Sequence, residues 1–388
     1  MKKEKSSNFN TYLIVIVVIA IAVGLYFMIS TPTTKEKPAE ITVTEKEVTI
    51  NLLGTDCKEC FNISMAVDFI KQQKTLKVKE VKELSIADSA ELIEKYNLSK
   101  LPAVLITGDI TNLTIPNFDQ IEDALVFAKT PAPYYDVATK KIKGKVSVIV
   151  LEEPACTECF DVKLLLQQLE AAGVKIAEQK TVEAKSDEGK LLIANYKIGK
   201  VPTIIFSKDA LDYDVITQVW DQVGTKESDG KLVLRTLNPP YINVSTGKTE
   251  GLVSLIVLSD KNCTECYNAS VIKELFQQNI NMQIKTEETV DVASTKGKML
   301  AKKYAIDLIP TVLLSKEASA YPNFEVAWQA VGTQEKDGMF VFRSVPLIEN
   351  AYKQQGKTFV YENLTSGEKI TGNTTTEEAE IAQPQPEE

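Results

Sequence analysis

Short apolar runs rich in β-branched residues recur along the chain, and each is followed by a stretch with a different pattern. Runs of this kind, bounded by polar residues, predict buried strands. In the stretch at 160–169 the apolar residues recur three and four positions apart, which predicts a helix with one buried face. The alternation of the two patterns predicts an α/β fold. The apolar runs lie at 50–53, 146–151 and 252–258.

The same order of patterns occurs three times, and each copy contains one cysteine pair. Each pair has the form Cys-x-x-Cys and lies between the apolar run and the amphipathic stretch. The first cysteines of consecutive pairs lie 99 and 107 residues apart, so each copy has the size of an ordinary domain rather than of a solenoid unit. The pairs are Cys57 and Cys60, Cys156 and Cys159, and Cys263 and Cys266.

A proline at the start of another apolar run lies at a matched distance in each copy, 45, 46 and 47 residues after the first cysteine. Proline is tolerated at the first residue of a strand, because no ladder hydrogen bond inside the strand is lost. A hairpin is predicted near the end of each copy, shorter in the first copy, which lacks the glycine of the other two. The prolines are Pro102, Pro202 and Pro310.

The repeat predicts three domains in series, each with its own core, in the coarse order β-α-β-α-β-β. Their predicted ranges are 41–138, 139–246 and 247–370. A short stalk is predicted at 30–40, where two prolines and mixed charges leave no apolar face. The acidic and polar residues at 371–388 predict a disordered tail.

The first thirty residues carry an apolar segment, Tyr12–Ile29, without any charged side chain. Its length suits a membrane-spanning helix, and the lysines before it place the N-terminus in the cytoplasm by the positive-inside rule. We therefore expect residues 1–11 to be cytoplasmic, 12–29 to be an uncleaved signal anchor, and the bulk of the chain to be extracytoplasmic at the cell membrane. A cleaved signal peptide is the alternative, although its apolar region would be shorter and would end in a small-residue cleavage site.

Composition excludes several classes of function for the 388-residue chain. A net charge of −9 argues against nucleic acid as a partner, because phosphate binding needs a basic surface. The chain contains no histidine, which removes Ser-His and Cys-His nucleophile pairs and histidine-ligated metals. The chemistry therefore depends on the six cysteines.

Two cysteines three positions apart, at the start of a helix after a buried strand, can form a disulfide and can also exchange it. The partial positive charge of a helix N-terminus stabilises a thiolate on the first cysteine, and the second can then resolve a mixed disulfide. Structural disulfides that staple a helix end are an alternative in an extracytoplasmic protein. Zinc binding is a third reading, but a Cys₄ site needs two pairs to converge and would leave one pair unmatched, so we expect no metal.

A cysteine pair, a helix, a proline and then a strand, repeated three times, resembles the thioredoxin superfamily, and three tandem copies resemble disulfide isomerase-like proteins. The resemblance covers about 41–372 and implies a central mixed sheet flanked by helices in each domain. It implies cis peptide bonds at the three prolines, with the preceding residue presenting its backbone to a substrate. The cis-proline loops would be Leu101 with Pro102, Val201 with Pro202, and Ile309 with Pro310.

The resemblance further implies that Cys57, Cys156 and Cys263 are nucleophiles and that Cys60, Cys159 and Cys266 resolve. No cofactor beyond these redox-active disulfides is expected. The sequence departs from the family pattern in three ways. The tryptophan usual before the pair is absent, and the apolar runs before the pairs show no clear acidic residue, where the family carries a buried proton acceptor. The pairs enclose Lys-Glu or Thr-Glu, whose carboxylates disfavour a neighbouring thiolate, although acidic residues also suit the first turn of a helix.

The function that we predict is exchange or isomerisation of disulfides in exported proteins by a membrane-anchored oxidoreductase. One apolar helix without cysteine offers no route for electrons across a membrane, so a reductase would need a membrane redox partner. The alternative is a non-catalytic scaffold or binding protein, in which thioredoxin-like domains are stapled by inert disulfides. Resemblance of fold does not decide between them, because function resides in the site.

Overall fold

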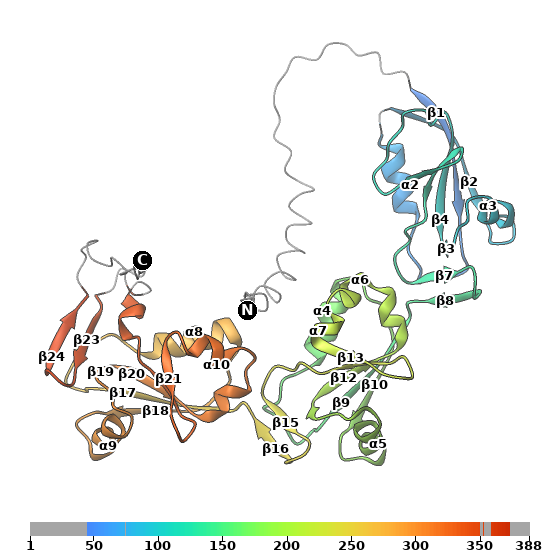
Figure 1. Ribbon diagram of the computed structural model, residues 1–388. Coiled ribbons are helices and arrows are strands. Elements are labelled where there is room, and N and C mark those ends of the chain that lie inside the picture. Colours follow the sequence, from blue (N-terminus) through green and yellow to red (C-terminus); the bar gives the residue numbers. More distant parts are fainter. Residues whose placement is uncertain (1–44, 74, 350–351, 353–357, 373–388) are drawn as a thin grey trace, which may run out of the picture.

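The computed structural model describes residues 45–73, 75–349, 352 and 358–372, which form three α/β units in series (Figure 1). The predicted cytoplasmic segment, membrane anchor and stalk lie outside these ranges, as does the predicted tail from residue 373 onward. Among the helices that are described, none has the length and apolar character needed to cross a membrane.

The first unit is built on a five-stranded mixed sheet in the order β2-β1-β4-β6-β5. Strand β1 is parallel to β2 and antiparallel to β4, and β6 is antiparallel to both β4 and β5. The elements are β1 (Lys46–Leu53), α2 (Ser64–Lys71), β2 (Leu76–Leu84), α3 (Ala90–Lys95), β3 (Lys100–Leu101), β4 (Ala103–Gly108), β5 (Asp119–Ile121), β6 (Ala124–Phe127), β7 (Tyr134–Asp136) and β8 (Lys141–Lys143).

The second unit repeats this order, with the sheet β10-β9-β12-β14-β13, and adds short helices after β12. Its elements are β9 (Val146–Glu152), α4 (Lys163–Ala171), β10 (Ile176–Glu183), α5 (Asp187–Tyr196), β11 (Lys200–Val201), β12 (Thr203–Phe206), η1 (Lys208–Asp212), α6 (Asp214–Thr217), α7 (Trp220–Val223), β13 (Gly224–Lys226), β14 (Leu232–Leu234), β15 (Tyr241–Asn243) and β16 (Lys248–Glu250).

The third unit has the sheet β18-β17-β20-β22-β21 and matches the second closely. Its elements are β17 (Val253–Ser259), α8 (Ser270–Ile280), β18 (Ile284–Asp291), α9 (Thr295–Lys303), β19 (Leu308–Ile309), β20 (Thr311–Leu314), η2 (Lys316–Ala320), α10 (Phe324–Trp328), β21 (Gly332–Gln334), β22 (Phe340–Phe342), η3 (Val345–Ile348), β23 (Val360–Asn363) and β24 (Glu368–Thr371).

Each central strand is buried on both faces because helices cover the two sides of the sheet. In β9 the alternation of side chains directs Val146, Val148 and Val150 into a core that contains Leu166 of α4. Leu151 points to the other face, into a core with residues of α5. The apolar runs of the sequence are therefore central strands, as their continuous apolar character predicts.

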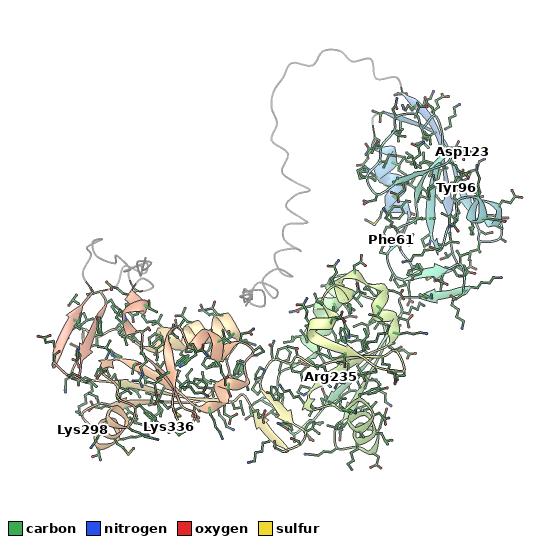
Figure 2. The ribbon with its side chains drawn as sticks, in the orientation of Figure 1. Phe61, Tyr96, Asp123, Arg235, Lys298 and Lys336 are labelled. Atoms are coloured by element: carbon green, nitrogen blue, oxygen red, sulfur yellow. A yellow bond between two sulfur atoms is a disulfide. The ribbon has the colours of Figure 1, made fainter. Side chains whose placement is uncertain are left out.

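The end of the second helix is tied to the last hairpin of the sheet in every unit. Tyr96 donates a hydrogen bond from its hydroxyl to Asp123 across 2.8 Å (Figure 2). In the first unit only Glu122 and Asp123 join β5 to β6, so the prediction of a shorter hairpin is confirmed. Equivalent hydrogen bonds join Tyr196 to Asp229 at 2.8 Å and Tyr304 to Asp337 at 2.9 Å.

A second sheet, of three strands, ends each unit. Because of it, the boundaries between units differ from those predicted from the sequence. The residues before each predicted cis-proline form the first strand, and a hairpin forms the other two, in the orders β3-β7-β8, β11-β15-β16 and β19-β23-β24. The predicted boundaries after residues 138 and 246 fall inside the first two hairpins. Because both strands of each hairpin belong to the preceding unit, the boundaries lie instead at Gly144 and Gly251.

These two glycines form the junctions between units. Both have positive φ, 81° and 91°, and a Cβ at Gly144 would lie 2.5 Å from the Cβ of Ala132. Their carbonyls accept hydrogen bonds from tyrosines of the following unit, Tyr213 at 2.6 Å and Tyr321 at 2.9 Å. Each unit therefore contacts the next directly at the point where the chain crosses between them.

The loop that joins β7 to β8 in the first unit is held by one carboxylate, that of Asp136. It accepts hydrogen bonds from the backbone N–H of Thr139 at 2.7 Å and from Lys143 at 2.9 Å. In the other units Asn243 accepts the equivalent bond from the backbone N–H of Thr246 at 3.3 Å, and Asn363 accepts it from Ser366 at 3.2 Å, so an amide oxygen performs the same task.

We expect Asp136→Ala to speed amide hydrogen exchange of residues 134–143 roughly fivefold, the effect of losing about 1 kcal/mol of hydrogen bonding. Asp136→Asn keeps an acceptor for the Thr139 N–H but loses the charge that pairs with Lys143, so at neutral pH it should speed exchange by a smaller factor than Asp136→Ala. Bonds from Thr139 and Lys143 lower the pKa of Asp136 to about 2. The contribution of the ionised carboxylate should therefore persist above about pH 3.8 and fade as the pH drops towards 2. An equal effect of both variants would contradict this role.

Candidate functional site

Each cysteine pair forms a disulfide within a turn between the first strand and the first helix of its unit. The S–S distances are 2.08, 2.06 and 2.05 Å, in chain order. The sulfurs lie ahead of the helices, because α2, α4 and α8 begin four residues after the second cysteine of each pair. The prediction that the pair opens the helix is therefore wrong.

The start of each helix is set by a side chain that sequence reasoning missed. The Oδ1 atom of the residue two positions after the second cysteine accepts a hydrogen bond from the backbone N–H two residues further on, which fixes an Asx turn ahead of the helix. The distances are 3.0 Å for Asn62, 2.9 Å for Asp161 and 3.0 Å for Asn268. Because these turns separate the sulfurs from the helix N-terminus, the positive end of the helix dipole acts on them less than predicted.

The prolines predicted from the family resemblance occupy the expected place. The peptide bonds of Leu101-Pro102, Val201-Pro202 and Ile309-Pro310 are all cis, which confirms that part of the prediction. The three prolines and the residues before them are buried. In the second unit Pro202 lines the same cavity as Cys156 and Cys159, so proline and disulfide face a common space.

The backbone before each cis-proline is already paired with the unit's own hairpin. Leu101 lies opposite Tyr135, Val201 opposite Ile242, and Ile309 opposite Glu362, each in an antiparallel ladder of two residues. That a substrate pairs with this backbone stays a prediction, and it requires the hairpin to move away from this edge.

A second contact fixes the hairpin against the cysteine turn. The residue after the second cysteine donates its backbone N–H to the carbonyl of the residue that precedes or begins the first hairpin strand. These bonds run from Phe61 to Pro133 at 3.3 Å, from Phe160 to Pro240 at 2.8 Å, and from Tyr267 to Val360 at 2.9 Å. In each unit the hairpin is therefore hydrogen-bonded both to the cis-proline loop and to the cysteine turn.

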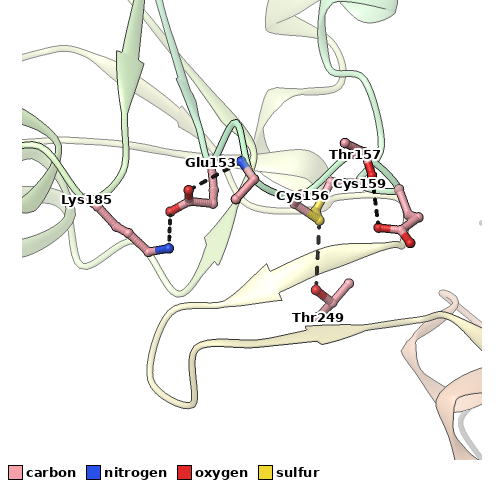
Figure 3. Close-up of a disulfide and its surroundings, with 8 residues drawn as sticks. Glu153, Cys156, Thr157, Cys159, Lys185 and Thr249 are labelled. Carbon is pink, nitrogen blue, oxygen red and sulfur yellow. Dashed lines mark hydrogen bonds and ion pairs between the residues drawn. A yellow bond between two sulfur atoms is a disulfide. The ribbon is translucent and has the colours of Figure 1, made fainter.

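The hairpin contributes side chains to the site, and these differ between the units. In the second unit Thr249 of β16 reaches the disulfide, with its Oγ1 atom 3.9 Å from the Sγ atom of Cys156 (Figure 3). The residue opposite the one before the cis-proline has a cross-strand partner in each hairpin. These pairs are Tyr135 with Ile142 in the first unit, Ile242 with Thr249 in the second, and Glu362 with Lys369 in the third. The sequence signal for these residues is the similarity of the segments that end the three copies, YDVATKKIKG at 135–144, YINVSTGKTEG at 241–251 and YENLTSGEKITG at 361–372.

Access to the nucleophiles predicted from the resemblance varies. A cavity of about 560 Å³ adjoins Cys57 and is lined by Tyr135, Ile142, Lys58 and Lys145, among others. The cavity at Cys156 is smaller, about 230 Å³. Cys57 and Cys156 are half-buried, whereas Cys263 is only 8% exposed. The three sites therefore offer an incoming disulfide different amounts of room.

Lysines compensate two of the glutamates that lie between the cysteines. Lys145 lies 2.5 Å from Glu59, and Lys369 lies 2.6 Å from Glu265. These ion pairs lower the pKa of both carboxyl groups. Each glutamate thus stays ionised but has a neighbouring positive charge, which weakens the repulsion that it exerts on a thiolate.

Comparison with known proteins gives distant structural matches only. No family model matches the chain, and no curated protein matches it. Among solved structures, ERdj5 form II has 11% identity and a TM-score of 0.15, over 83% of this chain and 44% of that one. Human ERp44 in a zinc-bound form has 13% identity and a TM-score of 0.12, over 70% and 79%.

A protein disulfide oxidoreductase from Aeropyrum pernix K1 has 16% identity and a TM-score of 0.13, over 42% of this chain and 77% of that one. The chain thus spans less than half the length of ERdj5. Such scores carry no functional argument. The strand order, the cysteine turn before the first helix and the cis-proline before the third sheet strand fit three tandem thioredoxin-like domains.

We expect Thr249→Val to raise the pKa of the Cys156 thiol after reduction, because the hydroxyl can donate a hydrogen bond to the thiolate. Alkylation of Cys156 by iodoacetamide near pH 7, followed by mass spectrometry, should slow severalfold. Thr249→Ser keeps the hydroxyl and serves as the control. Equal alkylation rates in the two variants would contradict the assigned hydrogen bond.

Proposed function

We propose that the chain is a thiol–disulfide oxidoreductase or isomerase that acts on exported proteins through its three cysteine pairs. The observation that carries the proposal is the threefold recurrence of a disulfide turn and a buried cis-proline loop that contact the same hairpin, with a cavity against the disulfide in the first two units. A purely structural staple needs no such cavity next to its sulfurs.

In the proposed reaction the reduced first cysteine attacks a client disulfide as a thiolate. A bond forms between its Sγ atom and one client sulfur, and the other client sulfur leaves as a thiolate that takes up a proton. The second cysteine then loses its proton and attacks the first, which closes the protein disulfide and releases the client thiolate. The client is reduced by two electrons and the pair is oxidised, and the reverse sequence oxidises a client.

The proposed setting is the outer side of a cell membrane, with the chain held by the apolar segment Tyr12–Ile29. The proposed partners are exported protein substrates and, for net reduction, a membrane redox partner. The redox-active disulfides would be the only cofactors, and neither a metal nor nucleic acid is part of the proposal. Three sites tethered on one chain would act on one client at raised effective concentration.

One observation favours a second candidate, a scaffold with inert disulfides. The backbone edge before each cis-proline is occupied by the unit's own hairpin, and Cys263 is nearly buried. A site closed in this way protects a disulfide from exchange unless the hairpin opens. The two candidates differ in the reduction potential and reactivity that they require of the disulfides.

We expect Cys159→Ser to trap Cys156 in mixed disulfides with exported proteins, because the resolving thiol is gone. Adducts would be collected from cells after acid quenching and identified by mass spectrometry, with Cys156→Ser in the same background as the control. We also expect reduction potentials between about −120 and −270 mV in a glutathione titration of the full chain. Potentials well below about −300 mV, together with no adducts from the corresponding serine variants of all three pairs, would favour the scaffold.

A further inference from the structure

We infer that Glu362 is the proton acceptor and donor for Cys266, so the third site has an acid–base group at the hairpin position that carries Tyr135 in the first unit and Ile242 in the second. The inference rests on the proposed function and names a residue that sequence reasoning did not single out. Strand β17, which precedes the third pair, carries no acidic residue. Glu362 reaches the sulfurs from β23, more than ninety residues later in the chain.

The geometry brings one carboxylate to both sulfurs. A carboxylate oxygen of Glu362 and the Sγ atoms of Cys263 and Cys266 all lie within 4.8 Å of one another. Glu362 is held there by β23, where it pairs with Ile309 directly before the cis-proline. Its side chain is partly buried, so the carboxylate is fixed by the same pairing that positions the cis-proline.

The other two units place different side chains at this register. Tyr135 lies opposite Leu101, and Ile242 lies opposite Val201. A tyrosine hydroxyl keeps its proton near neutral pH, so it does not take up the proton of a thiol as a carboxylate does, and isoleucine has no ionisable group. The backbone that carries the position is the same in all three units, so the second unit provides a natural control with an aliphatic side chain at the position of Glu362.

The charges around Glu362 suit a proton exchanger. The groups that face it are Asp260 after β17, Glu265 in the cysteine turn, and Lys369 on the neighbouring strand β24. Lys369 forms its ion pair with Glu265 rather than with Glu362, at 2.6 Å. Burial, followed by Asp260 and Glu265, raises the pKa of Glu362 above its usual value, against the opposite effect of Lys369. An acid works best when its pKa lies near the working pH.

The chemical step balances in both directions. When a client is bound to Cys263 as a mixed disulfide, the Cys266 thiol gives its proton to the Glu362 carboxylate. The Cys266 thiolate then attacks the Sγ atom of Cys263, the Cys263–client bond breaks, and the client leaves as a thiolate. In the reverse direction an incoming thiolate attacks Cys263, Cys266 leaves as a thiolate, and the Glu362 carboxylic acid returns the proton.

The test uses the full chain with the other four cysteines replaced by serine, so that only the third pair reacts. The reduced protein is mixed with oxidised glutathione between pH 5.5 and 9, quenched with acid, alkylated and analysed by mass spectrometry. Glutathionylation of Cys263 and closure of the Cys263–Cys266 disulfide are followed as separate rates. The proteins compared are the unsubstituted third site, Glu362→Gln and Glu362→Asp.

We expect Glu362→Gln to slow closure at least about tenfold below pH 7, so that the Cys263–glutathione adduct accumulates. Glutathionylation of Cys263 should change less than threefold, and Glu362→Asp should restore part of the closure rate. In a matched chain that keeps only the second pair, Ile242→Glu should speed closure below pH 7, whereas Ile242→Gln should not. This gain in the second unit does not depend on the folding of any Glu362 variant.

Closure by Glu362→Gln at the unsubstituted rate and with the same pH profile, while exchange proceeds normally, would overturn the role of Glu362 and leave the proposed function standing. An equal slowing of both steps would also overturn that role, because the loss of a proton acceptor for Cys266 slows closure and not glutathionylation of Cys263. Failure of every pair of the unsubstituted chain to exchange with glutathione would overturn the proposed function and the role of Glu362 together.

Discussion

The structure depends on the pairing between the residue before each cis-proline and the hairpin that ends the unit. Proline has no backbone N–H, so the strand is interrupted there and the adjacent buried backbone needs another partner. The hairpin supplies it, through ladders at Leu101, Val201 and Ile309. Because the same hairpin accepts a hydrogen bond from the residue after the second cysteine, it connects the proline loop to the disulfide.

Much of this arrangement could be predicted from the sequence, because its signals are local and repeated. The central strands, the place of each cysteine pair between strand and helix, and the short first hairpin follow from patterns within a few residues, whereas the cis peptide bonds were expected only from the family resemblance. The covering hairpins could not be predicted in the same way. Strand β7 has only three residues, and its partner β3 lies more than thirty positions earlier. The repeated segments marked the hairpins, but no local pattern shows that they fold back on the cysteines.

Neither the first residue of each helix nor the position of Glu362 beside the sulfurs could be predicted from the sequence, and the physical reasons are related. An Asx turn at Asn62 or Asn268 needs only one side-chain oxygen. Because asparagine is also common in other turns and loops, its presence in the sequence does not mark the start of a helix. Glu362 reads as one more charge in a polar hairpin, since only long-range pairing reveals that it faces two sulfurs. Residue types were thus visible in the sequence, whereas proximity across a fold was not.

The closed hairpin and a role in disulfide exchange are compatible if opening is cheap. In each unit the hairpin is attached near the disulfide by a two-residue ladder and by backbone hydrogen bonds on either side of it. Hydrogen bonds of this kind contribute about 1 kcal/mol each, and opening would also expose the buried side chains Tyr134, Tyr241 and Val360, so burial adds to the free energy of opening. The need for the hairpin to open would slow disulfide exchange without preventing it. An enzyme and a scaffold therefore differ here in the free energy of hairpin opening, and their architecture can be the same.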